Sequence, residues 1–315
     1  MADDLPLMMR VATVGLNLAM AIAIGASAAS RALARSAAPW AERQCGRLRL
    51  AILAGLATAM LTSASLLLFE AAAMAEVPVA EAGDAAWTML TATHLGAAWT
   101  IGIGALAVSL GTTAAGFGAG AGRRRWRAPL LLAGLAVFLY TRSMVSHAAS
   151  GGDFSAAMLA DWLHLAMISL WVGEVVVAGA LTLATPVGER ADDRNAAARY
   201  VASLSASATI ALAAIVATGG FSAWHNLGSV GALTGNPYGN ALLVKVGLVG
   251  MAVLMGGYNR FFVMPSLLMN LRRNGPAAAQ DVGRFALILR LETALLLCVL
   301  IIAAFVSSTS PPGAA

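Results

Sequence analysis

Residues 283–308 read GRFALILRLETALLLCVLIIAAFVSS, an almost unbroken apolar run with three charged side chains, Arg284, Arg290 and Glu292. A helix needs about 20 mostly apolar residues to cross the hydrocarbon core of a bilayer, and this stretch is long enough to do so. Seven further runs of the same kind precede it. The stretch therefore predicts a membrane-spanning helix, and its repetition predicts a membrane protein with many spans.

The apolar runs between charged and Pro/Gly-rich clusters predict eight spans. They cover roughly residues 8–34, 49–74, 85–112, 127–148, 155–185, 198–223, 239–264 and 283–308. The composition agrees, because 59% of the residues are hydrophobic and only 11% are charged, so lipid must be the solvent for most of the chain. We predict an all-α polytopic helical bundle that forms one integral membrane domain over residues 1–315.

The basic residues alternate between the predicted loops and gather on one side. Seventeen of the 20 Lys and Arg residues fall in segments 31–49, 123–127, 190–199 and 260–290. An excess of Lys and Arg marks the cytoplasmic face, so both termini are predicted to be periplasmic, as an even number of spans requires. The positive net charge therefore reflects topology and predicts no nucleic-acid partner.

Several functional classes find no support in the sequence. A GxxxxGK[ST] phosphate-binding loop is absent, so ATP is not expected to drive the protein directly. The two cysteines, Cys45 and Cys298, share no motif spacing. Because there is also no recognisable catalytic constellation, we expect the protein not to be an enzyme.

All four histidines fall in the predicted outer half of the bundle. His94 and His164 are each predicted about nine residues, or ~14 Å, below the outer surface. His147 and His225 are predicted at the outer ends of their spans. An isolated membrane histidine often does no more than bond a neighbouring helix. Four histidines from four helices on one side favour a metal or cofactor site.

Neighbouring side chains indicate which metal such a site could take. Met144 precedes His147 by three residues, Met167 follows His164 by three, and Asp161 precedes His164 by three, so each pair is expected to share a helix face. A thioether beside an imidazole suits Cu(I), whereas imidazole with carboxylate suits Cu(II) or zinc.

Three further charged residues of the predicted spans bear on the function. Lys245 is expected to act as a charge partner, for example of Asp161, rather than to meet a cation itself. Glu174 and Glu292 fall in the inner half. They could continue a cation route inward, or they could be polar contacts between helices, and the sequence leaves both readings open.

Three stretches resemble the copper resistance protein D (CopD) family of bacterial inner-membrane proteins. The first is Val145-Ser146-His147-Ala148, then Leu163-His164-Leu165 and Leu170-Trp171-Val172-Gly173, similar to that family's "SHA … LH … WxGG" run. The second is Thr93-His94-Leu95-Gly96; the third runs from Gly219 through Pro237-Tyr238-Gly239, Leu242 and Lys245 to Tyr258-Asn259-Arg260 and Pro265. Glu174 departs from the pattern, since it stands where the family tends to have the second glycine.

The resemblance implies a copper-binding protein of the bacterial inner membrane that takes copper, as Cu(I) or Cu(II), from the periplasm and moves it into or across the bilayer. It also implies a separate CopC-like periplasmic protein as copper donor.

Two alternatives remain open at the level of sequence. One is a b-type haem or redox protein with His94 and His164 as axial ligands, although a second histidine pair near the inner face is missing. The other is a copper sensor or assembly subunit that uses the same metal site without transport.

Overall fold

The computed structural model describes residues 4–116, 121–227, 234, 237–273, 275 and 277–307, and within these ranges the secondary structure is helical throughout. The long helices are α1 (Leu5–Leu33), α2 (Pro39–Ala75), α4 (His94–Ala114), α5 (Ala121–Met144), α6 (Ala156–Val177), α7 (Ala191–Leu227), α8 (Pro237–Tyr258) and α10 (Ala278–Ser307). The shorter elements are η1 (Val79–Glu81), α3 (Gly83–Ala92), η2 (His147–Gly151), η3 (Ala178–Thr182), η5 (Asn259–Val263) and α9 (Met264–Arg273).

Seven helical segments of the described chain are long and apolar enough to cross a membrane. They are α1, α2, α4, α6 with η3, α7, α8 with η5 and α9, and α10. The remaining long helix, α5, packs along α4 and corresponds to the predicted span 127–148. The structure thus agrees with the prediction of about eight spans in an all-helical membrane bundle.

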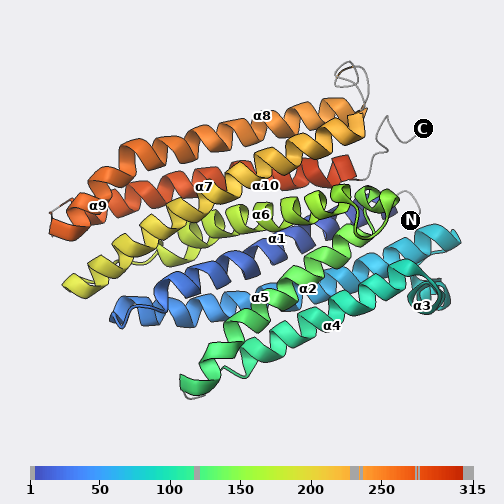
Figure 1. The fold of residues 1–315 in the computed structure, drawn as a ribbon, viewed down its shortest axis with the longest axis horizontal. Coiled ribbons are helices and arrows are strands. Elements are labelled where there is room, and N and C mark those ends of the chain that lie inside the picture. The colour runs from blue at the N-terminus through green and yellow to red at the C-terminus, as the bar shows by residue number, and fades with distance from the viewer. Residues whose placement is uncertain are drawn as a thin grey trace.

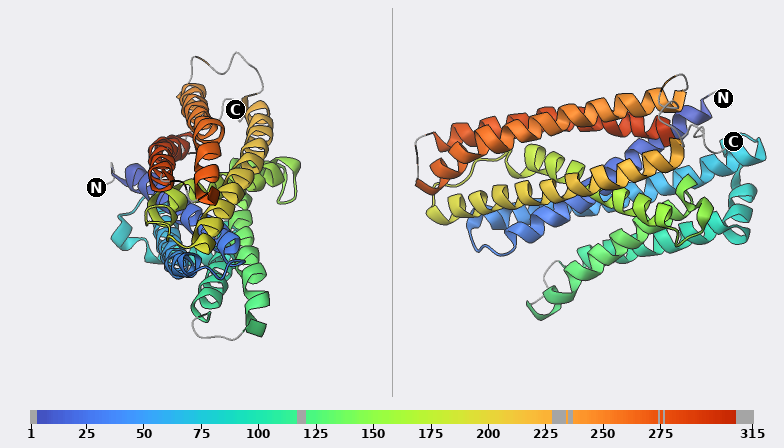
Figure 2. Two further views of the ribbon diagram at one scale, coloured as in Figure 1. Left: turned by 90° about the vertical axis from the view of Figure 1, so that its left-hand side faces the viewer. Right: turned by 45° about the horizontal axis from the view of Figure 1, so that its top comes forward.

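The axes of the long helices lie roughly parallel or antiparallel to one another along the long axis of the bundle (Figure 1). The start of α1, the end of α10 and the short helix α3 lie at one end of the bundle (Figures 1 and 2). We call this the outer end, after the orientation that the arginines predict, and the opposite end the inner end. The first residue of α1 and the last residue of α10 thus lie at the same end, as an even number of crossings requires.

Helix α1 is central to the bundle and packs on α2 and α6 through very small residues. A Cβ atom on Gly25 would lie 2.1 Å from the carbonyl carbon of Gly173, and one on Gly173 would lie 1.8 Å from the Ala21 carbonyl oxygen. The backbones of α1 and α6 are therefore in direct contact, as is typical of membrane helices joined by small residues. This contact fixes the position of Glu174, the next residue on α6.

Arginines of the inner end also bind helix carbonyls. Arg49 donates to the Thr113 carbonyl at the end of α4 at 2.7 Å, and Arg290 donates to the Gly179 carbonyl in η3 at 3.0 Å. The last carbonyls of a helix lack partners within the helix, and a guanidinium satisfies them well. These two arginines thus stabilise helix ends in addition to indicating the topology.

The predicted continuous span 85–112 is wrong at its outer end. The chain is extended at Thr93 (φ −122°, ψ 157°), and this residue separates α3 from α4. The Thr93 hydroxyl accepts a hydrogen bond from the Gly96 N–H at 3.0 Å, which is the geometry of a helix N-cap. A Cβ on Gly96 would lie 2.3 Å from the Leu90 carbonyl oxygen, so the tight junction of the two helices needs this glycine.

Candidate metal site

The best-defined candidate ligand is His164, which lies well inside the bundle on α6. Its Nδ1 atom lies 2.9 Å from the hydroxyl oxygen of Thr218 on α7. A Cβ on Gly219 would lie only 2.9 Å from His164 Cε1, so the glycine leaves room for the imidazole against α7. Thr218 and Gly219 together determine where the ring lies between the two helices.

The hydrogen bonds of Thr218 assign the proton on His164. Thr218 donates its single hydroxyl proton to the Ala214 carbonyl at 2.6 Å, so its oxygen is left to accept from His164. This arrangement favours the tautomer in which Nδ1 carries the proton and Nε2 keeps its lone pair. A hydrogen bond from the ring nitrogen that does not bind the metal fixes the tautomer and the ring orientation of metal-ligating histidines. His164 is thus prepared to donate Nε2 to a metal ion.

Charged and polar groups surround the outer side of His164. Asp161, one turn away on the same helix, accepts a hydrogen bond from the Ser146 hydroxyl at 3.2 Å. Asp161 also interacts electrostatically with Arg142 of α5 and Lys245 of α8, and Lys245 with His164. The role of Lys245 as a charge partner of Asp161 stays a prediction, supported by this electrostatic interaction. One acidic residue and two basic residues, contributed by α6, α5 and α8, thus lie on the outer side of His164.

His94 lies at a different depth from the one predicted. Because α4 begins at His94, the residue is at the outer end of the bundle and not ~14 Å below it, and its side chain is 55% exposed. His94 Nε2 lies 2.9 Å from Asp153 Oδ2, in the connection between η2 and α6. This contact makes an exposed imidazole–carboxylate pair, separate from the environment of His164.

The other two histidines also lie at the outer end and are exposed. His147 begins η2, and His225, in the last turn of α7, stacks on Phe221 with the ring centroids 6.2 Å apart. Within the described chain, no group of three or more His, Cys, Asp or Glu side chains is arranged to hold a metal ion. The structure thus does not gather the four histidines into one multi-ligand site.

The two candidate methionines differ in their relation to histidine. Helix α5 ends at Met144, so Met144 and His147 do not share the helix face that their spacing of three predicted. Met167 and His164 both lie within α6, and Met167 is half-buried against the main core. Of the two pairs, Met167–His164 keeps the helical register that the prediction needs.

Two carboxyl groups are buried in the inner half, and Glu174 lies ~15 Å inward of His164 on the basis of ten residues of helix α6. Glu174, 5% exposed, has both carboxyl oxygens within 2.8 Å of the Ser207 hydroxyl on α7. Glu292 on α10, 2% exposed, has the Trp171 indole as its polar neighbour. The polar neighbour of Glu174 thus comes from α7, and that of Glu292 comes from α6.

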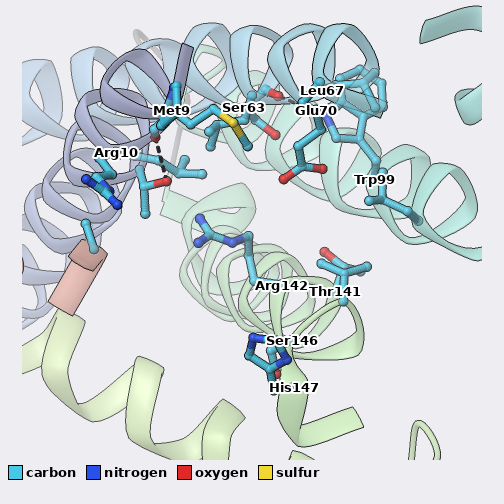
Figure 3. A pocket seen from close by; sticks show the side chains of 18 of the residues that line it. Met9, Arg10, Ser63, Leu67, Glu70, Trp99, Thr141, Arg142, Ser146 and His147 are labelled. Atoms are coloured by element: carbon cyan, nitrogen blue, oxygen red, sulfur yellow. Dashed lines mark hydrogen bonds between the residues drawn. The ribbon is translucent and has the colours of Figure 1, made fainter. Parts of the chain in front are cut away.

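A cavity of about 770 Å³ opens among α1, α2, α4 and α5 at the outer end. Its wall includes Glu70, Arg142, His147 and Met9 (Figure 3). Arg142 and Met9 both line this cavity, and neither was predicted as a site residue. Asp153, Thr218, Ser207 and Glu70 were not singled out as site residues either, because their roles depend on which helices pack together.

Comparisons with known proteins agree with the resemblance seen in the sequence. Residues 1–156 match the family model "Copper resistance protein D-like, N-terminal domain", and residues 198–306 match "Copper resistance protein D". The chain is 32% identical over 188 residues to the copper transport protein CutJ of Bacillus subtilis (strain 168), covering 59% of this chain and 31% of that relative. No solved structure matches.

A second relative matches over most of its length. The chain is 30% identical over 236 residues to copper resistance protein D of Pseudomonas syringae pv. tomato, and the match covers 73% of each chain. Together with the two family models and the membrane-spanning helices, this match identifies a multi-pass protein of the bacterial inner membrane with a role in copper homeostasis. The chain belongs to the copper resistance protein D family.

Proposed function

We propose that this protein takes copper from the periplasm and moves it into or across the inner membrane. The observation that carries the proposal is His164, a membrane-embedded imidazole whose Nδ1 is held by Thr218 so that Nε2 is left to bind a metal. Imidazole nitrogen suits both Cu(I) and Cu(II), and the neighbouring Asp161 or Met167 adds a carboxylate for Cu(II) or a thioether for Cu(I).

Copper would arrive through the exposed outer residues. His94 with Asp153 offers nitrogen and oxygen donors at the surface, and His147 and His225 are exposed at the same end. Exposed ligands in small groups bind weakly, which allows a cation to be captured and passed on. A separate CopC-like periplasmic protein is the proposed donor, since these side chains are accessible to a docked partner.

The inner half of the proposed route depends on Glu174 and Glu292. A buried ionised carboxylate in a membrane helix costs at least a few kcal/mol unless a cation offsets it, so each acid would attract a metal ion or a proton. Glu174 bonds only a hydroxyl, through Ser207, and no basic side chain of the described chain forms an ion pair with it. A passing cation could therefore be its counterion.

Copper uptake into reconstituted vesicles tests the proposal. Vesicles that contain the wild-type protein and an internal copper chelator should accumulate copper, and Glu174→Gln should slow uptake while preserving copper binding at the outer half. Glu189→Gln, the same change at an exposed position of the inner end, is the matched control and should be silent. Binding without uptake in the wild type would contradict transport and support a sensor or assembly role; unchanged uptake in Glu174→Gln would remove Glu174 from the route.

In this proposal the protein is a binder and carrier of copper rather than an enzyme. The haem alternative receives no specific support, because His94 Nε2 contacts Asp153 at the outer end while His164 lies deeper against α7. An absorption spectrum of the purified protein tests it directly, since a Soret band would favour haem over the copper proposal.

A further inference from the structure

The cavity at the outer end has apolar walls with two charged groups. Its apolar lining comes from Leu66, Leu67, Leu95, Trp99 and Phe138, among others. The guanidinium of Arg142, from α5, and the carboxyl of Glu70, from α2, both face the hollow between these helices (Figure 3). A site with a positive and a negative group on facing helices and apolar surface between them is suited to an amphipathic or dipolar ligand.

Arg142 and Glu70 do not neutralise each other by direct contact. Each acts electrostatically on the other, yet no ion pair within 4.0 Å joins them or links either to another side chain of the described chain. Arg142 offers five N–H donors in a fixed plane, and Glu70 offers two acceptor oxygens. Both side chains are only partly exposed, so their charges are incompletely hydrated, and a ligand that meets both would offset this cost.

The mixed sign of the cavity selects the chemistry of the ligand. Arg10, also in the wall, has its guanidinium 4.5 Å from the centre of the Phe305 ring and so is already engaged. Arg142 would repel a simple cation, and Glu70 would repel a simple anion. A zwitterion avoids both penalties, because its anionic group can meet Arg142 while its ammonium meets Glu70.

Both charged groups lie near the outer ends of their helices. Arg142 lies two residues before the end of α5 and Glu70 five before the end of α2, which is about 3 and 8 Å along the helices. The polar headgroup layer is about 5–8 Å thick on each side of the hydrocarbon core. A lipid headgroup and a small molecule from the periplasm can both reach this depth.

We propose that the cavity binds a zwitterion that carries an ammonium group and an anionic phosphate or carboxylate. This zwitterion is either the ethanolamine headgroup of a phospholipid, which we call the lipid source, or a free molecule such as phosphoethanolamine, which we call the free source. Arg142 binds the anionic group and Glu70 binds the ammonium. Neither residue is proposed as a copper ligand, so the zwitterion site does not rest on copper transport, although Arg142 also interacts electrostatically with Asp161 and His147 lies in the cavity wall.

Native mass spectrometry of the purified full-length protein tests the lipid source. The protein is equilibrated with mixed micelles that contain phosphatidylethanolamine, phosphatidylcholine or phosphatidylglycerol. Phosphatidylcholine keeps the charges but lacks N–H donors, and phosphatidylglycerol lacks the cation. Retention of phosphatidylethanolamine should exceed that of both, and Glu70→Gln should reduce this preference roughly ten- to hundredfold, as expected for the loss of a charge-assisted hydrogen bond.

Two variants accompany this experiment. Arg142→Lys keeps the charge but loses the planar fork, so it should weaken retention without abolishing it. Glu81→Gln makes the same change as Glu70→Gln at an exposed residue of the outer end that does not line the cavity, and it should have no effect.

Thermal-shift titration with O-phosphoethanolamine tests the free source. Stabilisation that Glu70→Gln removes, without any lipid preference, would assign the site to a free zwitterion. A preference for phosphatidylethanolamine that Glu70→Gln removes would assign it to the lipid. Equal retention of the three lipids together with no thermal shift, or a preference that survives Glu70→Gln, would overturn the proposal and leave a water-filled vestibule.

Discussion

Thr218 offers a sharp test of how His164 is prepared for copper. Replacing Thr218 by Val keeps the shape of the side chain and removes the hydroxyl that accepts from His164 Nδ1 at 2.9 Å. Thr218 is buried, with 7% of its surface exposed, so the imidazole N–H loses its partner where water does not easily replace it. We expect weaker copper binding because the tautomer and the orientation of the ring are no longer fixed.

The expected size follows from the hydrogen bond that is lost. Leaving a buried donor unsatisfied costs about 1–3 kcal/mol, and each 1.4 kcal/mol changes a binding constant tenfold. Copper affinity should therefore fall roughly 5- to 150-fold in Thr218→Val. Competition with a chromophoric copper chelator, performed on the purified protein in detergent, measures this change directly.

Two control variants separate the hydrogen bond from general effects on folding. Thr218→Ser keeps the hydroxyl and should bind copper almost as the wild type does. Thr100→Val removes a hydroxyl of α4 that bonds the Gly96 carbonyl of its own helix, and it should leave affinity unchanged. Wild-type affinity in Thr218→Val, or an equal loss in Thr218→Ser, would refute the role given to this hydrogen bond.

Two further predictions concern the fold. Reporter fusions should place residues 76–84 and 226–236 outside and residues 120–127 inside, since the arginines require it, and a cytoplasmic signal from 76–84 would reverse the orientation. Gly173→Ala puts a Cβ 1.8 Å from the Ala21 carbonyl oxygen, so α1 and α6 must separate, and the free energy of unfolding should fall by about 1–3 kcal/mol or more. Thermal unfolding in detergent measures this, with Gly104→Ala, which meets nothing within 4 Å, as the control; equal melting temperatures would contradict the close helix contact.

The sequence predicted the membrane spans well because lipid solvation acts on every residue of a span. Length, hydropathy and arginine placement located most helix ends to within several residues, with the largest differences at the start of α2 and at the end of the α8–α9 segment. The break at Thr93 was not predicted because the residues on both sides are as apolar as a continuous span would be. Only the Thr93 cap and the approach of Gly96 to Leu90 separate the two helices.

The candidate site was only partly predictable for a different reason. A sequence places a residue along its helix but does not give the rotation of that helix against its neighbours. His164, Asp161 and Glu174 were found from their own chemistry, whereas Thr218 and Ser207 gain their roles only by facing α6 from α7. The Met144–His147 pair failed because α5 ends at Met144, before the expected register is complete.

The amount of copper bound per protein tests the central proposal most directly. Wild-type protein, His164→Ala, His94→Ala and His225→Ala are purified in detergent, loaded with copper, washed with a weak chelator and measured by elemental analysis. The wild type should retain copper, His164→Ala should lose the tightly bound ion, and the two exposed variants should keep it, since His94 and His225 lie at the surface. Full retention of copper in His164→Ala would contradict the assignment of His164 as the principal ligand.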